Sequence, residues 1–94
     1  MNGKAPEADG ESLLRFPCDF PIKIMGAGTP GFRGLVVELV RRHAADLDEA
    51  RVQVRDSRTG RYQSVTVVVN ARSRAQLDAL YRELSDHPGI AMVL

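Results

Sequence analysis

The chain has 94 residues, of which 44% are hydrophobic and 27% are charged, and its 13 Lys and Arg against 12 Asp and Glu give a net charge of +1. This length has room for a single domain, no apolar run approaches the roughly 18 residues that a membrane span needs, and the near-neutral charge excludes a global field that would attract nucleic acid or an anionic membrane. The single cysteine, Cys18, excludes an internal disulfide and fits a reducing compartment, so we expect a soluble cytoplasmic protein.

The N-terminal segment differs in composition from the rest of the chain. Residues 1–12 combine Gly, Pro, Glu, Asp, Asn and Ser with almost nothing to bury, which predicts a disordered tail. They also lack a basic segment followed by an apolar core and therefore do not resemble a secretory signal. We expect one folded domain over residues 13–94, entered through the extended stretch "FPCDFP".

The first strand is predicted over residues 20–25, where apolar and other side chains alternate. A helix should follow, with Thr29 as its N-cap and Pro30 in its first position, where a missing N–H costs no hydrogen bond. One face of this helix is apolar at helical spacing, and its positions are Phe32, Leu35, Val36, Leu39, Val40 and His43. We expect the helix to end near residues 43–45.

A hairpin is predicted next, because Val52 and Val54 alternate with polar residues, as do the valines of residues 64–69. The intervening "DSRTG" has the composition of a turn of about five residues. Ser73 and Gln76 then form a capping box for a second helix, which "DHPG" ends. The closing "IAMVL" reads as a last strand.

The resulting order, βαββαβ, predicts the α+β class: a ferredoxin-like split βαβ fold with a four-stranded antiparallel sheet and two helices on one face. This order bears on "GAGTPG" at residues 26–31, which matches the G-x-G-x-x-G pattern of dinucleotide sites. A dinucleotide fold continues through further parallel β-α units, whereas here the chain turns back in a hairpin. We therefore expect Gly26 and Gly28 to serve a tight turn with φ > 0, while a second interpretation keeps this loop as a pocket for a small carboxylate.

Several segments together resemble a known family. They are "FPCDFPIKIMG", "VVELVRRHA", "RYQSVTVVVNA", "LYREL" and "IAMVL", and they resemble the YbeD-like family of small bacterial proteins of uncharacterised function over about residues 16–94. The resemblance implies a fold similar to the ACT-type regulatory domains, which bind amino acids and control metabolic enzymes. It also implies a link to lipoate metabolism, because members are labelled putative lipoate regulatory proteins, and it implies no catalytic residues. This chain departs from shorter members in its N-terminal tail and in the "GAGTPG" loop.

The sequence offers no catalytic or metal-binding set, and we expect a protein that is not an enzyme and has no cofactor. His43, His87 and Cys18 lack the paired spacings of zinc ligands, and Cys18 has no basic neighbour in sequence. His43 lies on the apolar face of its helix, which favours a half-buried structural role over that of a catalytic base.

Candidate binding residues fall into three groups. The small-carboxylate interpretation assigns Met25, Gly26, Gly28 and Thr29 to a ligand site at the loop. The exposed face of the sheet is predicted to carry Lys23, Met25, Tyr62, Ser64, Thr66 and Val68, a mixed surface that suits a protein partner or self-association, as an edge strand also would. The hairpin carries Arg51, Arg55, Arg58 and Arg61 against Asp56 alone, which suits capture of phosphate, binding of an acidic protein surface, or a solvated edge strand.

We therefore expect a non-enzymatic regulatory or protein-interaction domain that acts through Lys23, Tyr62, Ser64 and Thr66 on the sheet and senses a small carboxylate at the loop. The alternative is an RNA- or phosphate-binding module that uses Arg55, Arg58 and Arg61. Nucleic acid is the weaker choice, because RNA-recognition domains of this fold stack bases on several aromatic side chains and here only Tyr62 could serve.

Overall fold

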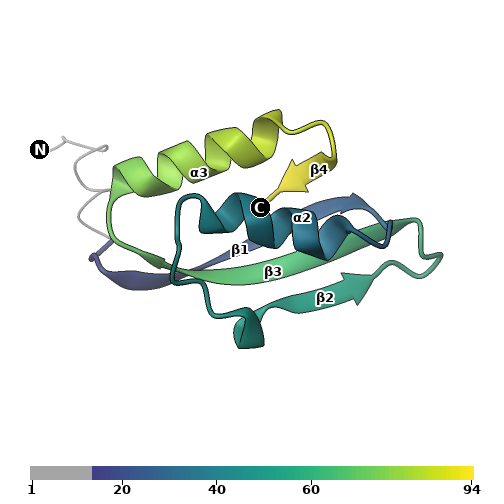
Figure 1. Cartoon of the computed structure of the whole chain (residues 1–94), viewed down its shortest axis with the longest axis horizontal. Coiled ribbons are helices and arrows are strands. Elements are labelled where there is room, and N and C mark those ends of the chain that lie inside the picture. The colour runs from purple at the N-terminus through teal and green to yellow at the C-terminus, as the bar shows by residue number, and fades with distance from the viewer. Residues whose placement is uncertain (1–13) are drawn as a thin grey trace, which may run out of the picture.

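A computed structural model describes residues 14–94 of the chain, shown in Figure 1. The tail expected over residues 1–12 lies outside the described residues. The elements are β1 (Cys18–Ala27), α2 (Phe32–Arg41), the 3-10 turn η1 (Glu49–Arg51), β2 (Gln53–Asp56), β3 (Tyr62–Ala71), α3 (Arg74–Asp86) and β4 (Ile90–Val93). Their order is the βαββαβ that the sequence predicts.

The four strands form one antiparallel sheet in the order β2-β3-β1-β4, which confirms the predicted ferredoxin-like fold. The two long strands, β1 and β3, are central and pair over ten residues, from Cys18 opposite Ala71 to Ala27 opposite Tyr62. β1 is therefore longer at both ends than the predicted residues 20–25, because β3 supplies partners along its whole length. Figure 1 shows α2 and α3 over the same side of the sheet.

The core lies between the helices and this side of the sheet. Alternate residues of β1 and β3 point into it, and the apolar stripes of both helices close it from above. Its fully buried side chains are Ile22, Ile24, Val65, Val67 and Val69 from the sheet and Val36, Val40, Leu80 and Leu84 from the helices. The inward positions predicted from the alternation of β1 and β3 are confirmed.

The start of α2 differs from the prediction. Thr29 is not the N-cap: its carbonyl accepts a hydrogen bond from the Phe32 N–H (3.1 Å), which closes a turn through Pro30 ahead of the helix. Gly31 is the N-cap, without a side-chain hydrogen bond. The reason is tertiary packing, because the buried ring of Phe32 lies against Gly26 and so fixes where the helix starts. The Thr29-Pro30 signal marks the turn rather than the helix.

The end of α2 is also earlier than predicted, at Arg41 instead of residues 43–45. The N–H groups of His43 and Ala44 both donate to the Val40 carbonyl, so the last turn tightens as the chain leaves the helix. Arg41 then holds the following loop by donating to the carbonyls of Ala45 (3.0 Å) and Leu47 (3.1 Å).

The hairpin and the second helix follow the predictions closely. Five residues, 57–61, connect β2 to β3, and Gly60 has φ +78° in the turn. The N–H of Gln76 donates to the Ser73 hydroxyl (3.0 Å), as the capping box requires. The Gln76 side chain accepts from the N–H of Arg72 (2.6 Å), one residue earlier than in the standard box, and donates to the His43 carbonyl (2.8 Å).

Candidate functional site

The side of the sheet that faces away from the helices, the open face, carries the polar half of the alternating pattern. Lys23 and Met25 of β1 stand on it between the buried Ile22, Ile24 and Gly26, and the even-numbered residues 62–68 of β3 stand on it between buried valines. This confirms the orientation predicted for the two central strands. No helix among the described residues covers the open face, because α2 and α3 both pack on the opposite side.

Two rows of side chains cross the open face. The strand register places Lys23 of β1 opposite Thr66 of β3, and Thr66 in turn opposite Gln53 of β2. In the next row the register aligns Met25, Ser64 and Arg55 in the same way. Residues that are 30 positions apart in the chain, such as Met25 and Arg55, therefore come within two strands of each other.

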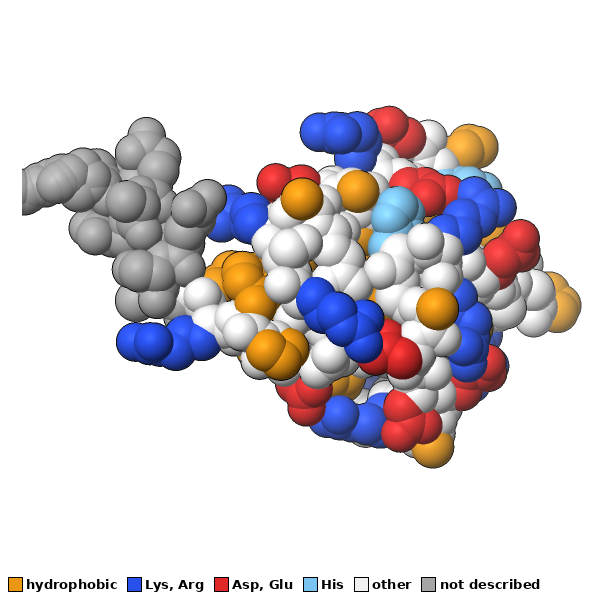
Figure 2. Space-filling view, turned by 60° about the vertical axis from the view of Figure 1, so that its left-hand side comes forward, with side chains coloured by type: hydrophobic (Ala, Val, Ile, Leu, Met, Phe, Trp, Pro, Cys, Tyr) orange, Lys and Arg blue, Asp and Glu red, His pale blue; other side chains and the backbone are white. Residues whose placement is uncertain are grey.

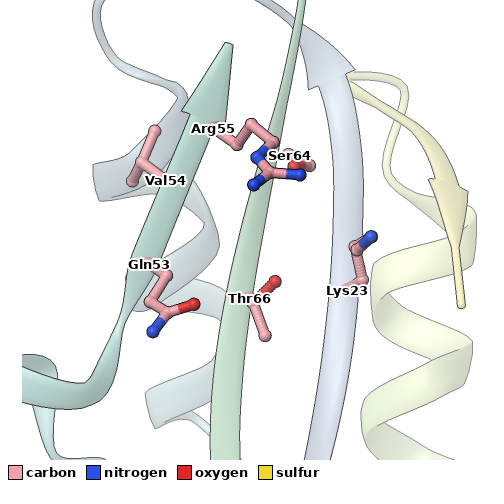
Figure 3. Close-up of a pocket in the computed structure, with 6 residues that line it drawn as sticks. All are labelled: Lys23, Gln53, Val54, Arg55, Ser64 and Thr66. Atoms are coloured by element: carbon pink, nitrogen blue, oxygen red, sulfur yellow. The ribbon is translucent and has the colours of Figure 1, made fainter. Parts of the chain in front are cut away.

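Residues of these two rows line an open concavity of about 500 Å³, which we call the sheet hollow. Its lining residues are Lys23, Gln53, Val54, Arg55, Ser64 and Thr66. Figure 3 shows the Arg55 side chain extending across β3 toward Ser64, whereas Val54 points to the outer edge of β2. The hollow thus has two hydroxyl groups on its floor and a cationic side chain at each side.

A second concavity of about 200 Å³, the side hollow, adjoins the first and shares Lys23, Arg55 and Ser64 with it. Its remaining lining residues are Met25, Asp56, Ser57, Tyr62 and Gln63. Tyr62 is 60% exposed and so presents much of its ring to solvent. The two hollows form one depression, polar at the Thr66 end and more apolar at the Tyr62 end.

Some charged side chains around this depression have a hydrogen-bond or ion-pair partner, and others have no partner of opposite charge. Arg51, the first of the hairpin arginines, pairs with Asp19 (3.2 Å), and Asp56 accepts a hydrogen bond from Gln63 (2.8 Å). Within residues 14–94, neither Lys23 nor Arg55 forms an ion pair. The cationic side chains that line the sheet hollow are therefore available to an external anion.

The structure brings some of the predicted binding residues of the sheet and hairpin together in one place and leaves others apart. Lys23, Arg55, Ser64 and Thr66 meet at the sheet hollow, and Tyr62 lies beside them. Arg58 and Arg61 are exposed residues of the turn and line neither hollow. Gln53 was missed by the sequence analysis, although its alternation with Val52 and Val54 was the signal that could have placed it on the open face.

The glycines of the "GAGTPG" loop owe their identity to close packing. A Cβ atom on Gly26 would lie 2.3 Å from the Phe32 ring, and one on Gly28 would lie 2.4 Å from the Gly60 carbonyl oxygen. The expectation of φ > 0 at Gly26 and Gly28 is wrong, since Gly60 is the glycine with positive φ in the described part of the chain. The close approach of the hairpin turn to this loop, rather than backbone handedness, requires the two glycines.

The four residues of the predicted carboxylate site do not surround one concavity. Met25 points to the side hollow, whereas a side chain on Gly26 would point to Phe32. The N–H of Gly28 donates to the Arg61 carbonyl (2.8 Å) and that of Thr29 to the Ala27 carbonyl (2.8 Å). Carboxylate binding by this loop stays a prediction, and these two donors already have protein partners.

His43 lies between the two helices and is half-buried, as expected of a structural histidine. Its Nε2 is 2.6 Å from Glu83 of α3, which also pairs with Arg42. The hydrogen bond with His43, aided by the Arg42 guanidinium, holds the pKa of Glu83 below its ordinary value of 4.5 although burial opposes the shift. Basic and acidic side chains lie next to each other over the face of the molecule in Figure 2, as such pairs require.

The described residues contain neither a group of side chains that could hold a metal ion nor a helix that could span a membrane. Between residues 14 and 94, His, Cys, Asp and Glu side chains form no group of three or more that could hold a metal ion. No helix in this part of the chain is long and apolar enough to cross a membrane. Cys18 is half-buried and free.

Comparison with known proteins shows strong sequence relatives. A family model described as "Protein of unknown function (DUF493)" matches residues 11–94. A UPF0250 protein of Nitrosomonas europaea is 50% identical over 84 residues, which are 89% of this chain and 97% of that protein. A UPF0250 protein of Bordetella parapertussis is 45% identical over the full length of both chains. The resemblance inferred from the sequence segments is thereby confirmed.

Solved structures with a similar fold are more distant in sequence. The solution structure of protein HP0495 from H. pylori has a TM-score of 0.69 at 12% identity and covers 99% of this chain and 98% of that one. The ACT domain from GTP pyrophosphokinase of Chlorobium tepidum has a TM-score of 0.61 at 15% identity and covers 82% of this chain and 97% of that domain. These similarities show that the fold is ACT-like.

Proposed function

We propose a function from the premise that this chain belongs to the DUF493 family of proteins of unknown function: it is a non-enzymatic regulatory domain that docks on a partner protein through its open face. The ACT-like fold supports the regulatory part of this proposal. The non-enzymatic part follows from the YbeD-like resemblance, which implies no catalytic residues.

The docking proposal rests on the mixture of exposed apolar and cationic side chains on the open face. Tyr62, Met92 and Leu94 are between 50% and 61% exposed. Met92 pairs with Met25, and Leu94 exchanges two backbone hydrogen bonds with Lys23, so both stand on the open face. Large exposed apolar side chains next to unpaired cations are typical of a surface that meets a protein with apolar and acidic groups.

The regulated pathway follows from the resemblance alone. We propose that the partner is a metabolic enzyme, and lipoate metabolism is the pathway that the YbeD-like resemblance implies. A small carboxylate at Met25, Gly26, Gly28 and Thr29 would act on the same regulatory domain. Support for this last element is limited to the glycine-rich sequence of the loop, because the Gly28 and Thr29 N–H groups already donate to carbonyls.

Photo-crosslinking tests the docking proposal. The full chain would carry a benzophenone amino acid at Thr66 or Met92 on the open face, or at Glu38 or Arg82 on the exposed sides of the helices, in native cell extract. We expect one metabolic enzyme to be captured from both open-face positions, with the yield reduced about tenfold by Tyr62→Ala, a size typical of an interface hot spot. Equal capture from the helix positions would contradict the proposal, and capture of a second copy would replace the partner by self-association.

The alternative of RNA or phosphate capture by the hairpin is favored by one observation. Arg55, Arg58 and Arg61 form no ion pairs within residues 14–94. Binding of RNA would weaken steeply with salt and with Arg55, Arg58 and Arg61 changed to Ala. Salt-independent binding that survives the triple change would exclude this alternative.

A further inference from the structure

We propose that the sheet hollow binds the phosphate group of a small phosphate monoester whose organic part lies in the side hollow. This inference goes beyond the docking function and stands without it. The evidence is the chemistry of the lining residues, the arrangement of the two rows that cross the sheet, and the change from polar to apolar lining along the depression.

The lining of the sheet hollow offers hydrogen-bond donors and positive charge, and it contains no carboxylate. Ser64 and Thr66 are two residues apart on β3, so their hydroxyl-bearing side chains stand on the same face and both contribute to the floor. Lys23 and Arg55 flank them from β1 and β2, and the Gln53 amide completes the row of Thr66. Such a set stabilises an anion, because each of these side chains can donate to an oxygen.

The spacing of the two cations fits a single tetrahedral group. Adjacent strands lie about 4.8 Å apart, so β1 and β2, which flank β3, are separated by about 10 Å. Lys23 and Arg55 have long side chains and can both reach a phosphate seated over Ser64 and Thr66. A guanidinium can hold two of its oxygens at once, while the ammonium acts as a compact charge.

The charge balance favors one phosphate rather than a carboxylate or a polyphosphate. A phosphate monoester carries a charge of about −1.5 to −2 at pH 7, which two cations match. A lone carboxylate would leave one of the two cations uncompensated. Asp56, which lines the side hollow, would repel a second phosphate placed there.

The side hollow suits an apolar or aromatic ester group. Met25 and Tyr62 supply its apolar lining, and the exposed Tyr62 ring offers a surface on which a planar group can pack. The two hollows share Lys23, Arg55 and Ser64, so a ligand that binds in both has its phosphate within reach of the cations. The volumes of the two hollows, about 500 and 200 Å³, fit a compact molecule.

An NMR titration of the full chain tests the proposal with phenyl phosphate, inorganic phosphate and benzoate at constant ionic strength. We expect saturable shifts of the amide signals of residues 23, 53, 55, 64 and 66 with both phosphates. Phenyl phosphate should also shift the amide signals of Met25 and Tyr62 and bind more tightly than inorganic phosphate. Benzoate has the same ring with a single carboxylate charge and should bind at least tenfold more weakly than phenyl phosphate.

Matched variants locate the site. Lys23→Gln and Arg55→Gln should each raise the Kd for phenyl phosphate about tenfold, the effect of losing one charge-assisted contact. Tyr62→Ala should weaken phenyl phosphate but leave inorganic phosphate unchanged. Arg82→Gln is the control, because Arg82 is an exposed arginine of α3 that lines neither hollow, and it should leave both Kd values unchanged.

Three results would overturn the proposal. One is an effect of Arg82→Gln as large as that of Arg55→Gln, which would indicate diffuse electrostatic attraction rather than a site at the sheet hollow. Another is benzoate binding as tightly as phenyl phosphate. The third is a single-stranded oligonucleotide binding far more tightly than phenyl phosphate at the same residues, which would assign the face to nucleic acid. Because the titration uses the purified chain alone, its failure leaves the docking proposal standing, and a failed crosslinking experiment leaves this one standing.

Discussion

At the scale of single residues, the glycines show how one residue type serves different physical needs. Gly60 adopts positive φ in the hairpin turn, whereas Gly26 and Gly28 leave room for a ring and a carbonyl oxygen. Gly34 lies inside α2 with nothing within 4 Å of the position of a Cβ atom. A side chain added at Gly28 and one added at Gly34 should therefore have opposite effects on stability.

Gly28→Ala should lower the free energy of unfolding by about 1–3 kcal/mol, because the new Cβ overlaps the Gly60 carbonyl and the backbone must shift. Gly34→Ala is the matched control and should raise it by about 0.5–1 kcal/mol, because alanine loses less entropy in a helix. Urea denaturation of the two variants measures both values. An unchanged stability of Gly28→Ala would mean that the loop and the hairpin turn are not in firm contact.

The sequence marked the "GAGTPG" loop as special and excluded a dinucleotide site, but it assigned the wrong cause to the glycines. A positive φ is a local property of a turn, as at Gly60 in the hairpin. The contact of Gly28 with Gly60 joins residues 32 positions apart. Such a contact depends on how the sheet brings β1 and the hairpin together, which no local pattern contains.

At the scale of elements, the two helices differ in how their starts are specified. α3 starts where its capping residues predict, because the Ser73 hydroxyl satisfies the Gln76 N–H. α2 has no side-chain cap, and its start follows the burial of Phe32. The capping signal predicted the start of α3 correctly, because the cap is a strong local interaction there. It was misleading for α2, because the burial of Phe32 determines where that helix starts.

Ser73→Ala should destabilise the protein by about 0.5–2 kcal/mol, since a first-turn N–H loses its hydrogen-bond acceptor. Ser85→Ala, an exposed position within α3, is the control and should change stability little. Thermal unfolding followed by circular dichroism compares the two. Equal effects of both changes would show that the cap contributes nothing specific.

At the scale of the whole molecule, the sheet register assembles the candidate site. The alternation of β1 and β3 was enough to predict that Lys23, Ser64 and Thr66 share a face. The pairing of β2 with β3 adds Gln53 to the row of Lys23 and Thr66 and places Arg55 opposite Ser64, while Arg58 stays in the turn. Sequence patterns predict which side chains of one strand share a face. Which residues of neighbouring strands lie opposite each other is known only from the folded sheet.

The link between α2 and α3 through His43, Arg42 and Glu83 predicts how stability depends on pH. Because folding lowers the pKa of Glu83, its contribution is present above the ordinary value of 4.5 and is lost as the pH falls through the lower folded value. Glu83→Gln should therefore lower the Tm at pH 7, and its difference from the wild type should shrink below about pH 4.5.

A Tm series from pH 7 to pH 3 measures this difference. Glu38→Gln is the control, because Glu38 meets Arg42 at a longer distance (3.5 Å) on an exposed surface, and at pH 7 it should cost less Tm than Glu83→Gln. A Tm difference for Glu83→Gln that stays constant over the series would contradict the assigned role of the carboxylate.

The contact between the "GAGTPG" loop and the hairpin turn connects one end of the sheet to the segment that leads into α2. Gly28 is bonded to Arg61 and touches Gly60 on one side, and three residues later the chain reaches the start of α2. The hairpin turn and the first turn of α2 are therefore linked by a direct contact and a short stretch of chain. A displacement of the turn by a molecule bound beside Arg55 and Tyr62 would be transmitted around the edge of the sheet to the helical layer on its far side.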